Sequence, residues 1–172
     1  MPHETTPLPV QTELSPQQYK DVFRRHAAGV AVITLQSTSG PVGFTATSVI
    51  SVSAAPPVLA FSIDPASSSW PALEAAATVV VNFLAHDQAA LSARFATHGI
   101  DRFDADDWSE LPTGEPVLHG TQAWVRGQVL DRLTVGSSRL VALHALSHHG
   151  PRDDAEPLVY LDRRYPRLDL TP

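Results

Sequence analysis

The chain has 172 residues, of which 43% are hydrophobic, and its formal net charge at pH 7 is −6. This is the length of a single domain of ordinary size that can bury a substantial core. The acidic balance and the lack of a basic cluster argue against a nucleic-acid partner. The absence of cysteine excludes disulfides, thiolate catalysis and iron–sulfur ligation.

Residues 1–14 are polar and contain several prolines, which predicts a flexible N-terminal tail. They lack the basic start and the apolar run of a signal peptide. No apolar stretch reaches the roughly 18 residues that a membrane-spanning helix requires. We therefore expect a cytoplasmic protein without a membrane partner, whose folded domain spans residues 15–170.

The first predicted element is a helix that begins after Ser15. Ser15 is a favourable N-cap, Pro16 suits the first turn, and Gln18 completes the pattern of a capping box. Apolar residues then recur at helical spacing until Gly29 ends the run, namely Tyr19, Val22, Phe23 and Ala27.

Beyond Gly29 the pattern changes to short apolar segments bounded by Gly, Pro and Ser, which predict strands. These segments are 30–35, 43–52, 58–63, 78–84, 123–130, 140–146 and 158–161. Two short helices are expected at 71–77 and 87–96, followed by a polar loop at 97–116, and loops of this length are often functional. Many short strands with few helices predict a mainly β, antiparallel barrel.

The most informative segment is 43–48, which reads Gly-Phe-Thr-Ala-Thr-Ser. Small hydroxyl side chains occupy a predicted strand where bulky β-branched residues normally pack, which gives a ligand close access to the backbone. An edge strand exposed to water is the alternative. The flanking Phe44, Val49 and Ile50 favour a buried strand, where hydroxyl groups need hydrogen-bonding partners that a planar polar heterocycle would supply.

Two further features suit a phosphate group. Ser67, Ser68 and Ser69 stand just before a predicted helix, and hydroxyls beside a helix N-terminus favour an anion, although a flexible capped loop is the commoner meaning of such a triplet. Arg102 offers a guanidinium group that binds phosphate in a bidentate way. A surface ion pair with Asp101 or Asp104 is the alternative for Arg102.

Together with 29–34 and 157–160, the segment 43–57 resembles the flavin reductase-like family of FMN-binding split barrels. The resemblance covers residues 20–168 and implies an antiparallel six- or seven-stranded split β-barrel with flanking short helices. It also implies an NAD(P)H-dependent flavin reductase that reduces FMN or FAD with NADH or NADPH and supplies a partner monooxygenase. Such proteins form homodimers, for which the helix face beginning at Tyr19 and the preceding tail are the expected contacts.

The same resemblance implies which residues bind the flavin, whereas no catalytic side chain and no metal site are predicted. The flavin-binding candidates are Thr45, Ala46, Thr47, Ser48, Ser51, Ser67, Ser69, Val81, Asn82, Phe83, Phe95 and Arg102. For Asn82, a turn residue at the end of a strand is the alternative, because an amide inside an apolar strand needs both of its ends bonded.

The chain departs from the family pattern where many relatives carry Gly-Asp-His, because Gly136-Ser137-Ser138 stands there. Hydride transfer does not require a protein acid or base, since the flavin carries that chemistry. A flavin-binding protein that holds FMN as a prosthetic group or carrier, with little NAD(P)H oxidation, is therefore the alternative function. His144 is a candidate substitute for the missing histidine, whereas His148 and His149 are better explained as solvated loop residues than as metal ligands.

Overall fold

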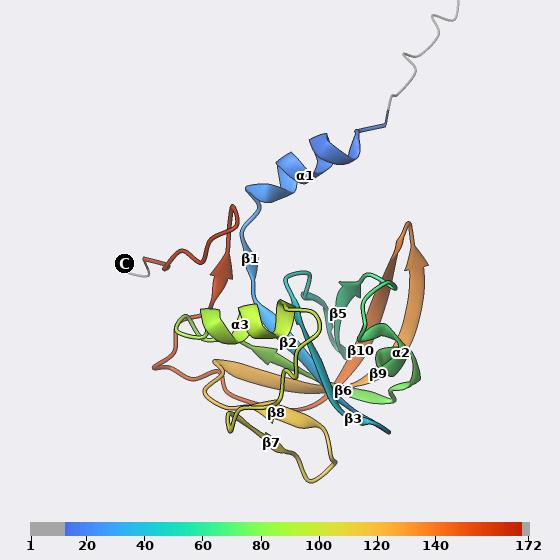
Figure 1. Cartoon of the computed structure of the whole chain (residues 1–172), viewed down its shortest axis with the longest axis vertical. Helices are drawn as coiled ribbons and strands as arrows, with labels where there is room; N and C mark the ends of the chain where they lie inside the picture. The colour runs from blue at the N-terminus through green and yellow to red at the C-terminus, as the bar shows by residue number, and fades with distance from the viewer. Residues whose placement is uncertain (1–12, 170–172) are drawn as a thin grey trace, which may run out of the picture.

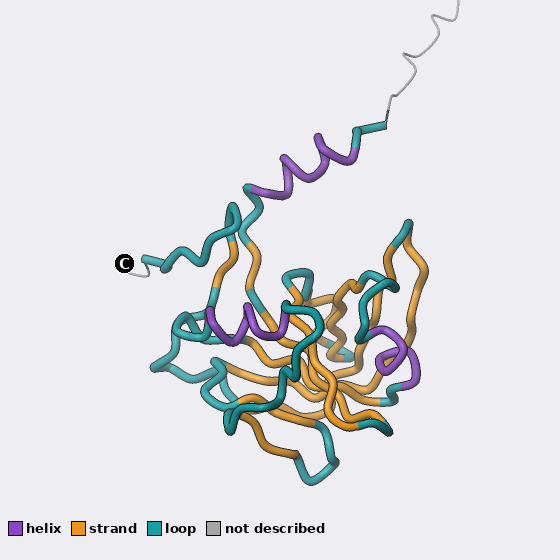
Figure 2. Tube along the Cα trace, viewed as in Figure 1, coloured by secondary structure: helices purple, strands orange, loops and turns teal. Residues whose placement is uncertain are grey.

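The computed structural model describes residues 13–169, which form a mainly β structure with short helices at its periphery (Figures 1 and 2). The helices are α1 (Pro16–Arg24), α2 (Trp70–Ala75) and α3 (Ala89–Ala96). Seven strands form one antiparallel sheet in the spatial order β3 (Gly40–Ala46), β2 (Ala31–Ser37), β6 (Thr78–Phe83), β9 (Ala123–Val135), β10 (Ser138–His149), β5 (Pro57–Ile63) and β4 (Ile50–Ala54).

Two smaller antiparallel pairs complete the fold. The first pairs β1 (Ala28–Gly29) with β11 (Val159–Tyr160), and the second pairs β7 (Trp108–Glu110) with β8 (Pro116–Leu118). The predicted fold class is confirmed: this is an antiparallel split β-barrel with flanking short helices. No helix among residues 13–169 is long and apolar enough to cross a membrane.

Residues 31–35 of β2 are buried on both faces of the sheet, and four of these five residues are apolar. Ile33 and Leu35 face the inner cluster of the barrel, whereas Val32 faces a second cluster beneath α3 and β8. Alternate side chains of a strand point to opposite faces, so a segment covered on both sides is apolar at nearly every position. Thr34 is the exception, and its hydroxyl group donates to the Pro116 carbonyl oxygen at 2.5 Å.

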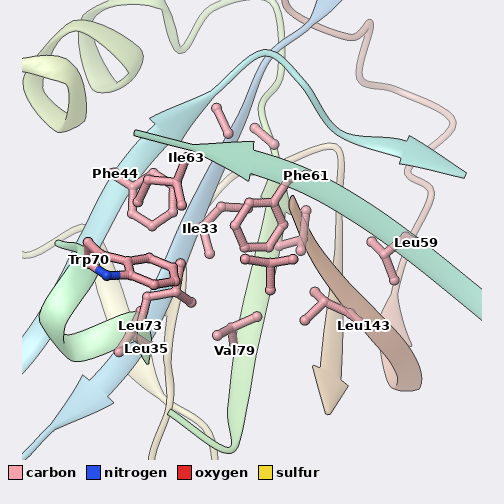
Figure 3. Close-up of a cluster of buried hydrophobic side chains, with 14 residues drawn as sticks. Ile33, Leu35, Phe44, Leu59, Phe61, Ile63, Trp70, Leu73, Val79 and Leu143 are labelled. Carbon is pink, nitrogen blue, oxygen red and sulfur yellow. The ribbon is translucent and has the colours of Figure 1, made fainter. Parts of the chain in front are cut away.

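The inner cluster fills the barrel and anchors α2. Phe44, Phe61 and Val79 come from three different strands, and Trp70 and Leu73 project into the same cluster from α2 (Figure 3). Leu73 is completely buried. The short helix is therefore held by its side chains against the barrel interior, which fixes the loop that precedes it.

Helix α1 begins as predicted, with Ser15 and Gln18 forming a capping box, but it ends at Arg24 and the chain then enters β1. It projects away from the barrel, and none of its residues is buried (Figure 1). Tyr19 and Phe23 pack on each other with ring centroids 4.6 Å apart and remain exposed. Most of the predicted tail, residues 1–12, lies outside the described residues.

The prediction of one continuous strand over 43–52 was wrong. The strand ends at Ala46, and a connection through Thr47, Ser48 and Val49 leads to β4 on the opposite edge of the sheet. Ser48 Oγ accepts a hydrogen bond from the Ser62 N–H at 2.9 Å, which fastens this connection to β5. The predicted loop at 97–116 also differs, because it contains β7 and the first residue of β8.

Candidate functional site

A pocket of about 220 Å³ lies where β3, the turn before α2 and the loop after α3 meet. Its walls bring together Ser69 and Arg102, two of the residues predicted to bind phosphate. The complete lining is Pro41, Val42, Gly43, Ser68, Ser69, Gly99, Ile100, Asp101, Arg102 and Phe103. Segments far apart in the sequence thus meet at one small polar opening.

Arg102 connects the three segments through its guanidinium group. Its Nη1 donates to the Gly43 carbonyl oxygen at 2.7 Å and to Ser69 Oγ at 3.3 Å. Its Nε and Nη2 donate to the Thr97 carbonyl oxygen at 3.0 and 2.8 Å. These bonds use four of the five N–H donors of a guanidinium group, so one donor is available to a ligand.

The charge of Arg102 is not neutralised by a neighbouring acid. Among residues 13–169, no ion pair includes Arg102, and its described hydrogen bonds end on carbonyl or hydroxyl oxygens. Asp101 instead accepts the Phe103 N–H at 2.9 Å. Partial burial lowers the pKa of Arg102, which reflects the penalty of holding this charge away from water. An anion at the pocket would offset that penalty.

The turn of Ser67, Ser68 and Ser69 (the serine turn) forms the opposite wall of the pocket. Ser69 is only 2% exposed, and its N–H donates to Ser67 Oγ at 3.3 Å. Helix α2 has only six residues. Hydroxyl groups and Arg102, rather than a helix terminus, are therefore the polar features of this wall.

Helix α2 is braced from the long hairpin formed by β9 and β10. Arg132 donates to the Leu73 carbonyl oxygen from Nε at 3.1 Å and also bonds the Ala76 carbonyl oxygen. Arg139 lies over the Trp70 ring, with its guanidinium carbon 5.7 Å from the ring centroid. Both arginines act on the element that carries the serine turn, and the sequence pattern did not identify either of them.

Gly43 lets β3 lie directly on the aromatic floor of the site. A Cβ atom at this position would stand 2.7 Å from Phe95 Cε1 and 3.1 Å from Phe103 Cζ, closer than carbon atoms pack. Phe95 is completely buried and meets Phe103 edge to face, with ring centroids 5.1 Å apart. The side chain of Phe95 therefore supports the pocket from below.

The hydroxyl-rich segment lies at the end of β3. Thr45 Oγ1 donates to the Ser92 carbonyl oxygen of α3 at 2.6 Å, and Ser48 is bonded to the backbone of Ser62. Ala46 is buried in the inner cluster, whereas the Thr47 side chain is exposed. Thr47 and the backbone of the segment are therefore the groups available to a ligand, because the hydroxyl groups of Thr45 and Ser48 already form hydrogen bonds within the protein.

Asn82 and Val81 lie in the interior, away from the pocket. The Asn82 amide nitrogen donates to the Val32 carbonyl oxygen at 3.0 Å and to Thr34 Oγ1 at 2.9 Å, and its oxygen accepts the Leu118 N–H at 3.0 Å. Both Asn82 and Val81 have no exposed surface. Their side chains therefore cannot touch a bound molecule, and Asn82 joins β2, β6 and β8 instead.

A second opening, of about 320 Å³, lies near the other edge of the sheet and includes the remaining two candidates, Ser51 and Phe83. Its lining is mostly apolar: Val49, Ile50, Ser51, Ser53, Pro57, Val58, Leu59, Phe83, Val125 and Ala145. Ile50 and Val52 of β4 are 54% and 57% exposed beside it. This face is unusually apolar for a surface in contact with water.

Gly136, Ser137 and Ser138 form the exposed end of the β9–β10 hairpin, where Gly136 adopts a φ of 57°. His144 lies six positions beyond Ser138 on β10, which corresponds to about 20 Å along a strand. His144 is thus far along the strand from the position of the missing histidine, and its role as a substitute stays a prediction. His149 stacks on Trp124, and the described residues contain no group of three side chains suited to a metal.

Known proteins resemble this chain over most of its length. The family model of the flavin reductase like domain matches residues 23–169. An NADH:FMN oxidoreductase from Rhodococcus qingshengii is 44% identical, covering 92% of this chain and 84% of the relative. The reductase subunit of a flavin-dependent monooxygenase from Rhodococcus jostii is 30% identical, covering 91% and 80%. The crystal structure of a flavin reductase domain protein from an Arthrobacter species superposes with a TM-score of 0.84 at 36% identity, covering 90% of this chain and 97% of that chain.

Proposed function

Because the chain belongs to the flavin reductase-like family, we propose that it oxidises a nicotinamide nucleotide and reduces a flavin that binds in the pocket of Arg102. NADH and FMN are the proposed pair, since the 44% identical relative is named an NADH:FMN oxidoreductase. The observation that carries the proposal is Arg102: a partly buried cation with neutral partners and a spare donor, beside the Ser69 hydroxyl. These groups fit the phosphate of FMN.

The flavin would extend from its phosphate, at the pocket of Arg102, along β3, and its ring would lie toward the end of that strand. In this arrangement Arg102 and Ser69 hold the phosphate, and Ser67, which does not line the pocket, supports Ser69 by accepting its N–H. Thr47 and the backbone of 45–48 lie along the ribityl chain and ring. Ser51 and Phe83 border the apolar opening on the far side of that connection. We assign Ala46, Val81, Asn82 and Phe95 a supporting role, because their side chains are buried.

When bound, the flavin supplies the hydride-accepting chemistry itself, so the chain has to bind and orient the reactants. Gly136, Ser137 and Ser138 offer no ionisable side chain at the hairpin turn. The absence of an acid and an imidazole there is compatible with hydride transfer. We therefore assign no residue a proton-transfer role and propose that Arg102 and Ser69 act by positioning.

The partner that we propose is a flavin-dependent monooxygenase that uses the reduced flavin. This proposal is supported by the relative from Rhodococcus jostii, which is named the reductase subunit of such an enzyme. The expected cytoplasmic location remains a prediction.

We also propose a homodimer. The apolar opening beside Ile50 and Val52, the unpaired edge of β4 and the exposed rings of Tyr19 and Phe23 support it. Exposed apolar patches of this kind are usual at interfaces between subunits. The face of β4 also borders the connection 47–49, so a second copy would lie close to the proposed flavin.

The direct experiment is to mix the protein with FMN and NADH without oxygen and to follow the visible absorbance of the flavin. We expect rapid bleaching, and the same mixture without protein is the control. An unchanged spectrum with both flavins and both nicotinamide nucleotides would contradict the reductase. If flavin also stayed on the protein through gel filtration, the prosthetic-group alternative would replace it.

A further inference from the structure

Helix α3 supports β3 at two points, one at each end of the proposed flavin site. Phe95 lies beneath Gly43, beside the pocket of Arg102. Three residues earlier in the helix, the Ser92 carbonyl oxygen accepts the hydroxyl group of Thr45 at 2.6 Å. Ser92 itself is only 1% exposed. The position of α3 therefore affects both the phosphate end and the ring end of the site.

The bond between Thr45 and Ser92 fixes the part of the backbone that faces the ligand. Phe44 and Ala46 belong to the inner cluster of the barrel. Because neighbouring side chains of a strand point to opposite faces, Thr45 points away from that cluster and toward α3. Its hydroxyl group serves as an anchor, which leaves the backbone of 45–48 to the flavin. A shift of the anchor would therefore move the groups that are proposed to orient the flavin ring.

Tyr165, in the C-terminal segment, holds Ser92 in turn. The Tyr165 hydroxyl oxygen and Ser92 Oγ form a hydrogen bond of 3.0 Å, although the two residues are 73 positions apart in the chain. The ring of Tyr165 packs on Tyr160 of β11, with ring centroids 5.3 Å apart. A continuous link thus leads from Tyr165 through Ser92 to Thr45, and no local pattern in the sequence identifies it.

The turn before Tyr165 directs this residue back toward α3. Leu161 and Arg164 exchange two backbone hydrogen bonds of 3.0 Å, and the residues between them, Asp162 and Arg163, have φ angles of 49° and 61°. Positive φ is unfavourable for a residue such as arginine and persists only where the surrounding structure holds it. Here the Asp162 N–H also donates to a carbonyl oxygen at the end of α1 at 3.0 Å. The course of the chain into Tyr165 is therefore fixed by its backbone.

We propose that Tyr165 is a positioning residue for the reaction. Through Ser92 it holds Thr45, and thereby the backbone that orients the flavin ring for hydride transfer. The inference rests on the proposed function, because it takes the flavin ring to lie at the end of β3. Tyr165 does not line the pocket of Arg102. It therefore affects the rate of hydride transfer more than the binding of FMN, since the phosphate keeps its own contacts.

The test is Tyr165→Phe, which removes the hydroxyl group and keeps the ring on Tyr160. The rate constant for reduction of bound FMN by saturating NADH is measured by anaerobic stopped flow. We expect it to fall about 3- to 10-fold, because even a misplacement of about 1 Å can cost about 100-fold. The dissociation constant of FMN, measured by fluorescence quenching, should stay within about twofold. Tyr160→Phe is the matched control, because it removes a hydroxyl group from the neighbouring ring, outside the link to Ser92.

A second variant separates positioning from a general effect on the fold. Ser92→Ala removes the hydroxyl group that Tyr165 bonds but keeps the carbonyl oxygen that holds Thr45. It should slow the reduction of bound FMN as much as Tyr165→Phe does. The double variant should be no slower than either single variant, since both substitutions break the same link. Losses that multiply in the double variant would show that no such link exists.

Two further results would overturn the inference. One is an unchanged rate constant in Tyr165→Phe, and the other is an equal fall in Tyr160→Phe. A variant that unfolds at lower urea concentration but reduces bound FMN at the normal rate would assign Tyr165 to stability alone. If the wild type did not reduce FMN, the proposed function itself would fail, whereas normal reduction by Tyr165→Phe would remove only this inference.

Discussion

At the scale of single residues, the decisive feature is a cation that has no carboxylate partner among residues 13–169. Arg102 bonds Gly43 and Ser69 across the mouth of the pocket, and burial lowers its pKa. Charge-assisted hydrogen bonds are about twice as strong as neutral ones, so a phosphate gains more from Arg102 than any neutral group does. The residue should therefore discriminate between flavins with and without phosphate.

Replacing Arg102 by glutamine tests this discrimination. We expect the dissociation constant of FMN to rise about 10- to 100-fold, since a hydrogen bond to a charged group contributes about 1.5–3 kcal/mol. Riboflavin lacks the phosphate, and its constant should stay unchanged. Arg167→Gln, whose side chain is 71% exposed and paired with Glu156, is the control. An equal loss for FMN and riboflavin would mean that Arg102 only supports the fold.

Asn82 shows why the sequence did not distinguish a binding residue from a supporting one. An amide within an apolar strand signals that hydrogen bonds must exist, and the structure supplies them. The partners Val32 and Leu118 are 50 and 36 positions away in the chain. Because a local sequence pattern does not reveal such distant neighbours, the sequence alone allowed either a ligand or the protein itself to be the hydrogen-bonding partner of Asn82.

At the scale of elements, the loop after α3 is fastened to the barrel by a buried ion pair. Glu115, which is 3% exposed, accepts hydrogen bonds from Arg126 Nε at 2.9 Å, from Thr78 and from Thr113. Burial alone would raise the pKa of Glu115, but these bonds outweigh it and lower the pKa to about 2. The ionised carboxylate is therefore favoured in the folded state.

The lowered pKa predicts how stability changes with acid. A carboxylate with a folded pKa of about 2 and an ordinary unfolded pKa near 4.3 contributes up to about 3 kcal/mol. This contribution is complete above the unfolded pKa and is lost as the pH falls from about 5 to 2. Glu115→Gln should unfold more easily at pH 7 and lose less stability on acidification, as measured by urea unfolding. A parallel loss in both proteins would contradict this.

Another prediction at this scale concerns the brace between the β9–β10 hairpin and α2. Arg132 bonds the carbonyl oxygens of Leu73 and Ala76, and Arg132→Ala would leave them to water. Because the serine turn is continuous with α2, we expect FMN affinity to fall about 3- to 10-fold and riboflavin affinity to change less. Arg152→Ala, at an exposed ion pair with Asp154, is the comparison. Unchanged FMN binding would show that α2 needs no brace.

The elements themselves were predicted best where apolar residues repeat regularly. All seven strands expected from the pattern exist, but 43–52 contains two strands, and β9 and β10 are longer than expected. The break after β3 accompanies the hydrogen bond between Ser48 and Ser62. The extra length of β9 and β10 accompanies the pairing of these two strands with each other. Both causes are tertiary contacts that a local pattern does not contain.

At the scale of the whole molecule, the order of the sheet brings the site together. Strands β3 and β4 are adjacent in the chain but lie at opposite edges of the sheet, and the connection 47–49 joins them. The strand pattern predicted the mainly β antiparallel class, whereas the split barrel and its flavin came from the family resemblance. The pocket of Arg102 required the tertiary structure, because residues near 42, 69 and 102 have no local relationship.

The dimer is the prediction that belongs to this scale. Ile50 and Val52 are more than half exposed beside an apolar opening, so a glutamate at residue 52 would place a charge within the proposed interface. We expect Val52→Glu to sediment as a monomer of 18.5 kDa and the wild type to sediment at twice that mass. A desolvated, unpaired charge is strongly unfavourable, which is why one substitution suffices.

Ala90→Glu, on the exposed face of α3, should remain dimeric. A monomeric wild type would refute the proposal, and a dimeric Val52→Glu would move the interface to the exposed face of α1, where Tyr19 and Phe23 lie.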